Sequence, residues 1–468
     1  MAAAAVDLEY TYRYRGESAL TADVGRTRLS LVTTSQPDCD PLFLHGNILS
    51  PKRTGDLLIA VADVVQSRFH IPAAMLAKIL RQSDPVITCS DEQCRFEGFS
   101  ACCGAYVRLD LLANAIDGER LDRGTTNVNF NAPMRTALSR VRDGEPMEVK
   151  IGAGAIEVES RGESIVERKV TLPSRWLRGF ADVQASQARM RPAFELSGAE
   201  FRRFLRELPQ GVKGEAWLSY VGGGVRISTR SSPGAIGAGG ISRLRVLDTA
   251  SRHVDRVRVY GSMEGDGLET AWELSTPDSR LTLALSPEVW RGFSGEGQLL
   301  DSLAETEDPK AMAAVKASLR WQEHIDVDEL VVNYGLDRDR VERELARLAA
   351  SGLVGYDLHH GTYFHRELPF RSEAIPKLQP RLAGARKLVD GDSVTFETLP
   401  QPSPWKEEGD KEPVKAWVRS GDVEYRVIID GDNARCTCVW FAKHGGSRGP
   451  CKHILAVNMA LERGDNAD

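Results

Sequence analysis

The sequence lacks the features that mark membrane proteins and secreted proteins. It contains no run of about 18 uncharged apolar residues, so it predicts no membrane span. Its first residues, Met1–Val6, have neither the basic start nor the long apolar run of a signal peptide. Only 8 cysteines occur among 468 residues, which is typical of a reducing compartment rather than of a disulfide framework. We therefore expect a cytoplasmic protein.

An excess of positive charge and the common catalytic motifs are also missing. The formal net charge is -6 and the pI is about 6.0, so contact with nucleic acid would need a local basic surface. There is no His-Glu-x-x-His and no phosphate-binding loop with its lysine. We expect a protein that is not an enzyme. The distant alternative is an enzyme whose site lies in the N-terminal α+β region, near Cys102 and Cys103, because scattered catalytic groups escape a motif search.

What the chain does contain is the composition of a globular protein, 42% hydrophobic and 27% charged. A length of 468 residues indicates about three domains. We predict an α+β multidomain protein with an N-terminal α+β domain (1–125), an α+β domain with internal repeats (126–305), a winged-helix-like module (306–370), a linker (371–411) and a ββα zinc finger (412–468).

Soft metal ligands cluster at coordinating spacing near the C-terminus. A Cys-x-Cys pair, Cys436 and Cys438, is followed after twelve residues by a Cys-x-His pair, Cys451 and His453. A structural zinc ion takes four thiolate or imidazole ligands in a tetrahedron and keeps no open position. The spacing therefore predicts one structural Zn²⁺. The alternative is a cluster of reduced cysteines that packs beside a hairpin and binds no metal.

The residues around these ligands predict a ββα frame. Two alternating stretches, 416–420 and 423–429, indicate strands joined by a tight turn. A helix is expected from about Cys451, with Ile454, Val457 and Leu461 along one stripe. Cys451 would then lie in the first helical turn, where the helix dipole favours a thiolate.

The Cys-x-Cys, loop, Cys-x-His order on this frame resembles the SWIM zinc finger over residues 412–464. That resemblance implies DNA binding or protein binding. The whole chain is also similar to bacterial SWIM zinc finger family proteins with a long uncharacterised N-terminal region. This second resemblance implies that the protein works beside a MoxR-type AAA+ ATPase and a von Willebrand A protein.

Two kinds of side chain around the metal loop are candidates for contacting a partner. Positive charge suited to phosphate is carried by Arg435, Lys443, His444, Arg448 and Lys452. Aromatic anchors suited to a protein partner are Trp417, Trp440 and Phe441, unless they fill the small core. We favour a non-enzymatic zinc-binding interaction protein that contacts a protein or nucleic acid. The alternative is a DNA-binding protein that uses the winged helix together with the finger.

A second cysteine group is less informative. Cys89, Cys94, Cys102 and Cys103 could hold a metal, but adjacent cysteines seldom bind one ion and Cys-x₄-Cys is not a usual knuckle. The surrounding stretch 101–107 is typical of a buried apolar segment, in which cysteine behaves as a small hydrophobe. We favour the buried interpretation over a second metal site.

The region 126–305 repeats a strand that ends in leucine, a capping residue and a short helix with aromatics. The three copies are 172–180, 196–204 and 285–293. In the second copy, Ser197 and Glu200 predict a capping box. Such repeated helix-plus-antiparallel-strand units indicate a scaffold.

Helical patterns over 309–323, 327–333 and 336–352, followed by short strands over 353–357 and 361–365, predict a winged helix-turn-helix. Its third helix carries alternating charges, which favour an ion-paired surface over a base-reading one. These charges are Arg338, Arg340, Arg343, Arg347, Asp337, Asp339, Glu342 and Glu344. We expect the histidines of the wing (His359, His360 and His365) to decorate its surface rather than bind metal.

Overall fold

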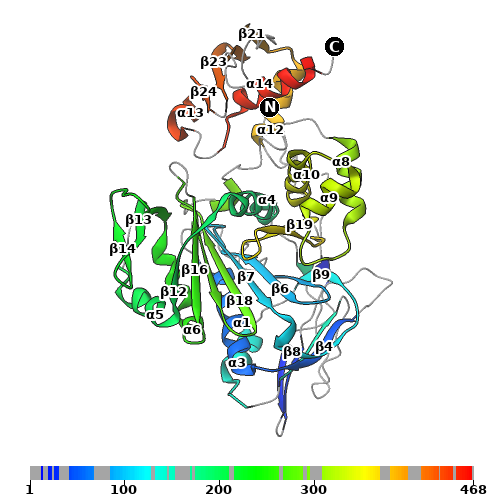
Figure 1. Ribbon diagram of the computed structural model, residues 1–468, viewed down its shortest axis with the longest axis vertical. Helices are drawn as coiled ribbons and strands as arrows, with labels where there is room; N and C mark the ends of the chain where they lie inside the picture. Colours follow the sequence, from blue (N-terminus) through cyan, green and yellow to red (C-terminus); the bar gives the residue numbers. More distant parts are fainter. Residues whose placement is uncertain are drawn as a thin grey trace. The chain divides into compact units, whose positions relative to one another are not determined.

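The computed structural model describes the chain in segments that form two compact units. The described residues are 12–13, 19–23, 26–30, 42–67, 85–127, 132–144, 147–152, 169–170, 174–209, 215–262, 267–287, 292–295, 308–368, 380–398, 413–431, 433–445 and 449–465. The first unit comprises Met1–Ser294, Leu319–Ile325 and Gly352–Phe370, and the second comprises Gly295–Ser318, Asp326–Ser351 and Arg371–Asp468 (Figure 1). None of the described helices has the length and hydrophobicity that a bilayer crossing requires.

An eight-stranded antiparallel sheet forms the centre of the first unit (Figure 1). Its order is β12 (Arg191–Ser197), β16 (Arg256–Gly261), β17 (Thr270–Ser275), β18 (Ser279–Leu285), β7 (Ala105–Leu111), β6 (Cys94–Phe99), β5 (Val86–Cys89) and β9 (Gly124–Asn127). The pairing of β18 with β7 runs from Ser279 opposite Leu111 to Leu285 opposite Ala105. This pairing joins the two halves that we predicted as separate domains with a boundary at residues 125/126.

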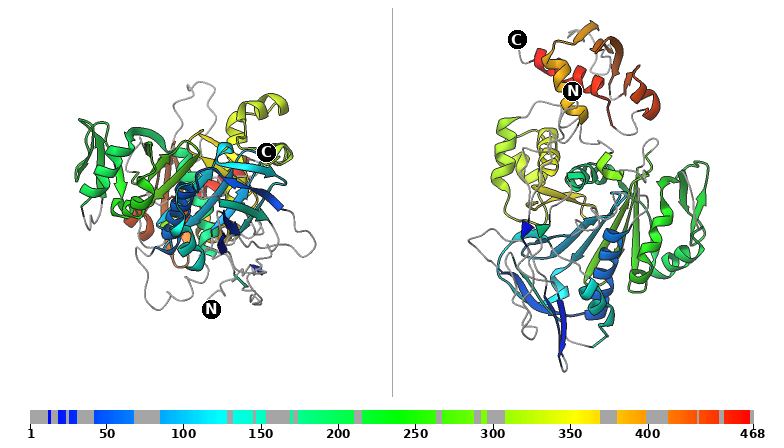
Figure 2. Two further views of the ribbon diagram at one scale, coloured as in Figure 1. Left: turned by 90° about the horizontal axis from the view of Figure 1, so that it is seen from below. Right: turned by 180° about the vertical axis from the view of Figure 1, so that it is seen from behind.

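Helices pack on this sheet through apolar side chains. Helix α1 (Pro51–Gln66) lies along β6 and β7 and contacts α3 (Ala132–Arg140) (Figure 2). Helix α4 (Ser174–Arg189) contributes Phe180, whose ring centroid lies 4.9 Å from that of Phe99 on β6.

Smaller sheets complete the first unit. A five-stranded sheet has the order β2 (Ala19–Asp23), β3 (Arg26–Ser30), β10 (Met147–Gly152), β4 (Leu42–Ile48) and β8 (Ile116–Arg120). A three-stranded sheet has the order β14 (Val225–Ser228), β13 (Glu215–Tyr220) and β15 (Ile236–Gly239), and β1 (Tyr12–Arg13) pairs with β11 (Lys169–Val170). Shorter helical segments are η2 (Ala113–Ala115), η3 (Ile241–Leu247), α6 (Asp248–Ser251) and η4 (Gly292–Gly295).

The predicted repeats correspond to α4 and to α5 (Gly198–Glu207). The capping box is confirmed, because the Ser197 hydroxyl accepts from the Glu200 backbone N–H and the Glu200 carboxylate accepts from the Ser197 backbone N–H. Of the third copy, β18 is present, whereas residues 288–291 lie outside the described residues.

The second cysteine group is buried, as predicted for Cys102 and Cys103. Cys89 and Cys94, however, lie opposite each other on β5 and β6 and form a disulfide. The sequence did not predict this bond, because the two residues become neighbours only when the hairpin forms. The group therefore offers no four-thiolate metal site.

A hairpin of β19 (Val354–Asp357) and β20 (Thr362–His365) is joined to the large sheet by buried charges. Arg108 of β7 donates to the Tyr356 carbonyl at 2.7 Å and to Asp357 at 3.2 Å. Arg366, which follows β20, pairs with the buried carboxylate of Glu97 on β6. Burial alone would raise the pKa of Glu97, but Arg366 and the hydroxyl of Tyr106 hold it below the usual value.

The histidines predicted to decorate an exposed wing lie instead within this polar region of the first unit. His365 is 4% exposed and accepts a hydrogen bond at Nδ1 from the backbone N–H of Trp321 at 2.7 Å. His359 lies 2.8 Å from Glu273, and His360 lies 3.3 Å from Asp357. The prediction is wrong for His365, which is buried, whereas His359 is half-buried and His360 is exposed.

The second unit contains α8 (Pro309–Ser318), α9 (Val327–Tyr334) and α10 (Arg338–Ala350), which pack against one another. These three helices and the hairpin occur in the predicted order, but the hairpin belongs to the first unit. The ion pairs predicted on α10 are present, but Arg347 and Glu344 are buried rather than on its surface. Arg338 pairs with Glu342 at 3.1 Å, Arg340 with Asp308 at 3.4 Å and Arg347 with Glu344 at 3.2 Å.

The end of the second unit folds as α12 (Pro380–Asp390), β21 (Val394–Thr398), β22 (Val414–Ser420), β23 (Val423–Asp430), β24 (Asn433–Cys436), α13 (Val439–His444) and α14 (Lys452–Asp465). The four strands form one antiparallel sheet in chain order. Helix α12 and strand β21 lie within the predicted linker 371–411. The finger therefore has a larger frame than the predicted ββα unit.

Replacing Arg366 by Ala should lower the free energy of unfolding of the first unit by about 3–5 kcal/mol, because the Glu97 carboxylate would stay buried without its cation. Denaturant unfolding followed by tryptophan fluorescence measures this loss. The control is Arg123→Ala, which removes an exposed pair with Asp91 and should cost about 0–1 kcal/mol. Equal losses in both variants would contradict a structural role for the Arg366–Glu97 pair.

Candidate metal centre

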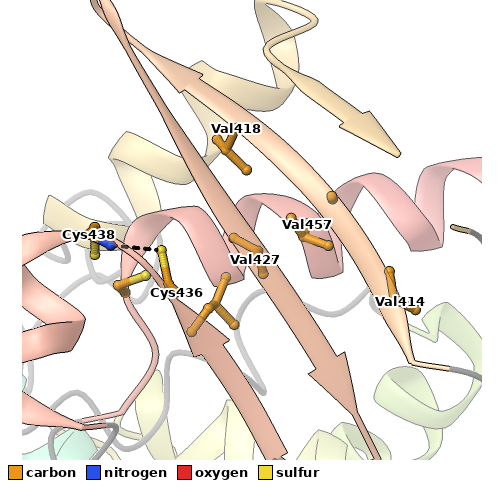
Figure 3. Packing of buried hydrophobic residues seen from close by; sticks show 9 residues of the cluster. Val414, Val418, Val427, Cys436, Cys438 and Val457 are labelled. Carbon is orange, nitrogen blue, oxygen red and sulfur yellow. Dashed lines mark hydrogen bonds between the residues drawn. The ribbon is translucent and has the colours of Figure 1, made fainter. Parts of the chain in front are cut away.

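The sheet of the finger is apolar on one face and polar on the other. Along β22, Val414, Ala416 and Val418 are buried, and Val427 joins them from β23. Figure 3 shows these valines facing Val457 on α14. Because side chains alternate along a strand, this register also points Cys436, the partner of Val427 on β24, toward the helix.

The four predicted ligands come together from three elements. Cys436 ends β24, Cys438 is the N-cap of α13, and Cys451 and His453 lie at the start of α14. All four are buried, and their ligand atoms lie within 4.8 Å of one another. The prediction that the spacing brings one set of ligands together is confirmed.

The distances fit a tetrahedral ion. Zinc binds sulfur at about 2.3 Å and nitrogen at about 2.0 Å, so a tetrahedron separates sulfur from nitrogen by about 3.5 Å. The distance from Cys436 Sγ to His453 Nδ1 is 3.7 Å. Among the described residues, His453 Nε2 is buried and has no hydrogen-bond partner, which leaves Nδ1 as the nitrogen that faces the sulfurs. Three thiolates and one imidazole thus form the site of one structural zinc ion.

Backbone N–H groups prepare two of the sulfurs for a negative charge. The N–H of Cys438 donates to Cys436 Sγ at 3.4 Å (Figure 3). The N–H of Phe441 donates to Cys438 Sγ at 3.3 Å. The second bond places Cys438 at the positive end of α13. Such bonds stabilise a thiolate, which is the form that binds zinc.

The third sulfur ionises most easily. A hydrogen bond from the Cys436 thiol, together with His453 and the backbone N–H groups that start α14, lowers the pKa of Cys451 to about 4. That bond and burial raise the pKa of Cys436, and burial beside the Cys451 thiolate raises the pKa of Cys438. A divalent cation offsets this mutual repulsion, so the donor set fits an ion that binds all three thiolates together.

The ring of His453 is fixed by stacking. Its centroid lies 4.3 Å from that of Tyr425 on β23, with the two planes 22° apart. The ring is therefore oriented before a metal binds, which reduces the entropy lost on coordination.

The comparisons with known proteins identify this part of the chain. Residues 425–462 match the SWIM zinc finger. The match includes all four ligands and extends from Tyr425 on β23 into α14.

Outside the finger the comparisons give little. No curated protein matches the chain at a significant level. Among solved structures, the crystal structure of Proliferating Cellular Nuclear Antigen from Entamoeba histolytica is similar with a TM-score of 0.33 and 11% sequence identity, covering 53% of this chain and 99% of that chain. A similarity at this level supports no inference about this protein.

The predicted binding residues around the SWIM finger differ in exposure. Arg435 on β24 and Lys443 on α13 are exposed. Lys452 is half-buried and donates to the Ser420 hydroxyl at 2.8 Å. Arg448 lies outside the described residues.

The predicted aromatic anchors separate into two groups. Trp417 is 37% exposed on the polar face of the sheet. Trp440 and Phe441 are half-buried and pack against the core of the finger. The expectation that some of these aromatics fill the core is confirmed for Trp440 and Phe441.

Arg381 on α12 is a residue of the metal centre that the sequence did not indicate. It donates to the Pro450 carbonyl at 2.9 Å, directly before the ligand Cys451, and its guanidinium lies 4.6 Å from the centre of the Trp440 ring. The basic run within 377–387 was the available signal, but it was interpreted as part of a linker. Arg381 holds the end of the metal loop against α12.

Replacing Cys438 or Cys451 by Ser should remove the zinc ion of the finger and unfold residues 412–464, because zinc binding supplies about 10–16 kcal/mol to small zinc domains. Zinc is measured by mass spectrometry of metals, and unfolding by protease sensitivity. The control is the double change of Cys89 and Cys94 to Ser, which should leave zinc content unchanged because this pair is a disulfide remote in sequence from the finger. Full zinc occupancy in both single variants would refute the ligand assignment.

Proposed function

We propose that this protein is a non-catalytic interaction protein that contacts a protein partner through the polar face of its SWIM sheet. The zinc site supports a structural rather than a catalytic role. Three sulfurs and one nitrogen complete a tetrahedron, so no coordination position remains for a substrate. The ion holds the finger's sheet and helices together. A partner is then recognised by side chains on the surface of the finger and not by the ion.

The observation that carries the proposal is an exposed tryptophan on the sheet face opposite α14. We call this surface the Trp417 face. The cross-strand register places Trp417 opposite Arg426 on β23, with the guanidinium 5.8 Å from the ring. Exposed tryptophans that are flanked by arginine are the side chains most often responsible for binding energy at protein interfaces.

The charges of the Trp417 face favour a protein over a phosphate backbone. Arg419 pairs with Glu424, and Arg426 pairs with Glu397, both at 3.0 Å. A surface that binds nucleic acid neutralises phosphates with cations that are not already paired with carboxylates. The paired charges here form a mixed rim around an aromatic centre, which is typical of protein interfaces.

The helices of the predicted winged-helix module support the same conclusion. On α10, the guanidinium groups of Arg338, Arg340 and Arg347 are engaged by carboxylates. An arginine that reads a base must present its guanidinium to the groove. We therefore propose that this module packs within the protein and does not read bases.

The partner class that we propose follows from the resemblance to bacterial SWIM zinc finger family proteins. It is a MoxR-type AAA+ ATPase together with a von Willebrand A protein. A second candidate function is binding of nucleic acid. It is favoured by the exposed cations Arg435 and Lys443, which flank the ligands Cys436 and Cys438 in sequence.

Replacing Trp417 by Ala should weaken binding of the zinc-loaded, full-length protein to its purified MoxR-type ATPase or von Willebrand A partner by about 30-fold, equivalent to about 2 kcal/mol. The dissociation constant is measured by calorimetry or interferometry. Zinc content should not change, because Trp417 lies on the face opposite the ligands. The matched control is Tyr220→Ala, which removes an aromatic of similar exposure (39%) from the first unit.

The same proteins are titrated with random single- and double-stranded DNA across salt concentrations. Two results together would replace the proposal by the second candidate. The protein would bind neither protein partner, and it would bind DNA with an affinity that falls steeply with salt and is lost in an Arg435→Glu, Lys443→Glu variant. Equal weakening by Trp417→Ala and Tyr220→Ala would show that the Trp417 face is not the contact surface.

A further inference from the structure

A second group of metal-ligating side chains lies in the first unit, away from the four ligands of the finger in sequence. It consists of His324, which precedes Ile325, and of Asp357 and His360, which lie at and after the end of β19. One ligand atom from each of the three lies within 4.8 Å of the others. The ring centroids of His324 and His360 are 3.9 Å apart.

Asp357 is held so that one carboxylate oxygen faces the histidines. Its Oδ1 accepts from Arg108 at 3.2 Å and from the backbone N–H of His359 at 2.9 Å. Its Oδ2 lies 3.3 Å from His360 Nδ1, whereas Arg280 and Arg95 are 3.7 Å and 4.0 Å from Oδ2, beyond a normal hydrogen bond. The carboxylate of Asp357 is buried and its Oδ1 is fixed by these hydrogen bonds, so its Oδ2 is directed toward the histidines.

The electrostatic surroundings permit a cation. Arg280 also lies 3.5 Å from His360 Nδ1, but it is shared with Asp110 and Gln93. A further carboxylate, Glu273, is buried beside His359, and its Oε2 has no hydrogen-bond partner within the described part of the chain.

We propose that His324, His360 and Asp357 bind a second divalent transition-metal ion. Two imidazoles and one carboxylate are the donor set of zinc, cobalt, nickel and ferrous iron in sites that keep coordination positions for water. Both histidines are exposed, so water reaches those positions. The ion would differ from the zinc of the finger in being exchangeable, because three ligands, two of them exposed, hold a metal less tightly than four buried ones.

The site connects two segments that are distant in sequence. His324 belongs to Leu319–Ile325, and the other two ligands belong to Gly352–Phe370. Both segments are parts of the first unit, although the residues between them belong to the second. A bound ion would therefore hold together the segment from which the chain leaves the first unit and the segment with which it re-enters that unit.

The test is the stoichiometry of Zn²⁺ bound to the full-length protein in equilibrium dialysis. The unchanged protein should bind two ions. Changing His324 or His360 to Ala should leave one, and both variants should remain folded because these side chains lie at the surface. Cys438→Ser should also leave one ion, and its combination with His360→Ala should leave none.

The matched control is His359→Ala, which removes the adjacent histidine that is not a ligand and should keep both ions. Replacement of zinc by Co²⁺ separates the sites by their spectra, because only the finger has thiolate-to-cobalt charge-transfer bands. In the Cys438→Ser variant, Co²⁺ should bind without these bands. Binding of one ion by the unchanged protein and of none by Cys438→Ser would overturn the proposal and leave a hydrogen-bonded His360–Asp357 pair. Equal loss in His359→Ala and His360→Ala would also overturn it.

Discussion

The coordination of one ion by four side chains from three elements is the interaction on which the finger depends. The finger's apolar core is small, with few buried residues besides the three cysteines. Cores of this size seldom supply enough burial to fold alone, and metal binding is one of the usual compensations. The raised pKa values of Cys436 and Cys438 mean that a cation is needed before all three sulfurs become thiolates. We therefore expect folding of this segment to be coupled to zinc binding.

The ligands were predictable because they are close in sequence and their spacing reflects local geometry. Cys436 and Cys438 are fixed by the end of β24 and the start of α13, and Cys451 and His453 by the first turn of α14. The rest depended on pairings between distant segments. The bonds between β7 and β18, and between β21 and β22, join stretches whose own patterns do not specify a partner. Such pairings between distant segments cannot be predicted from the patterns of the separate stretches.

Burial of charge was the other property that local patterns did not reveal. Arg95, Arg108 and Arg366 are fully buried, although arginine in a sequence usually indicates a surface. They are accommodated because carboxylates such as Asp110, Asp357 and Glu97 come from other strands and segments to pair with them. The surroundings of the histidines near β19 could not be predicted for the same reason. Their environment is set by the hairpin's contacts with the first unit and not by neighbours in sequence.

Strand β21 has a consequence for how the finger must be defined. It covers the outer edge of β22 by pairing Val394 with Val418 and Phe396 with Ala416. The segment that matches the SWIM zinc finger starts only at Tyr425, within β23. A fragment cut at that boundary would contain every ligand but would lack β21 and β22. One edge of β23 would then be unpaired, with only β24 beside it. Such unpaired edges add strands from other chains, so the isolated finger would be prone to self-association that the longer chain avoids.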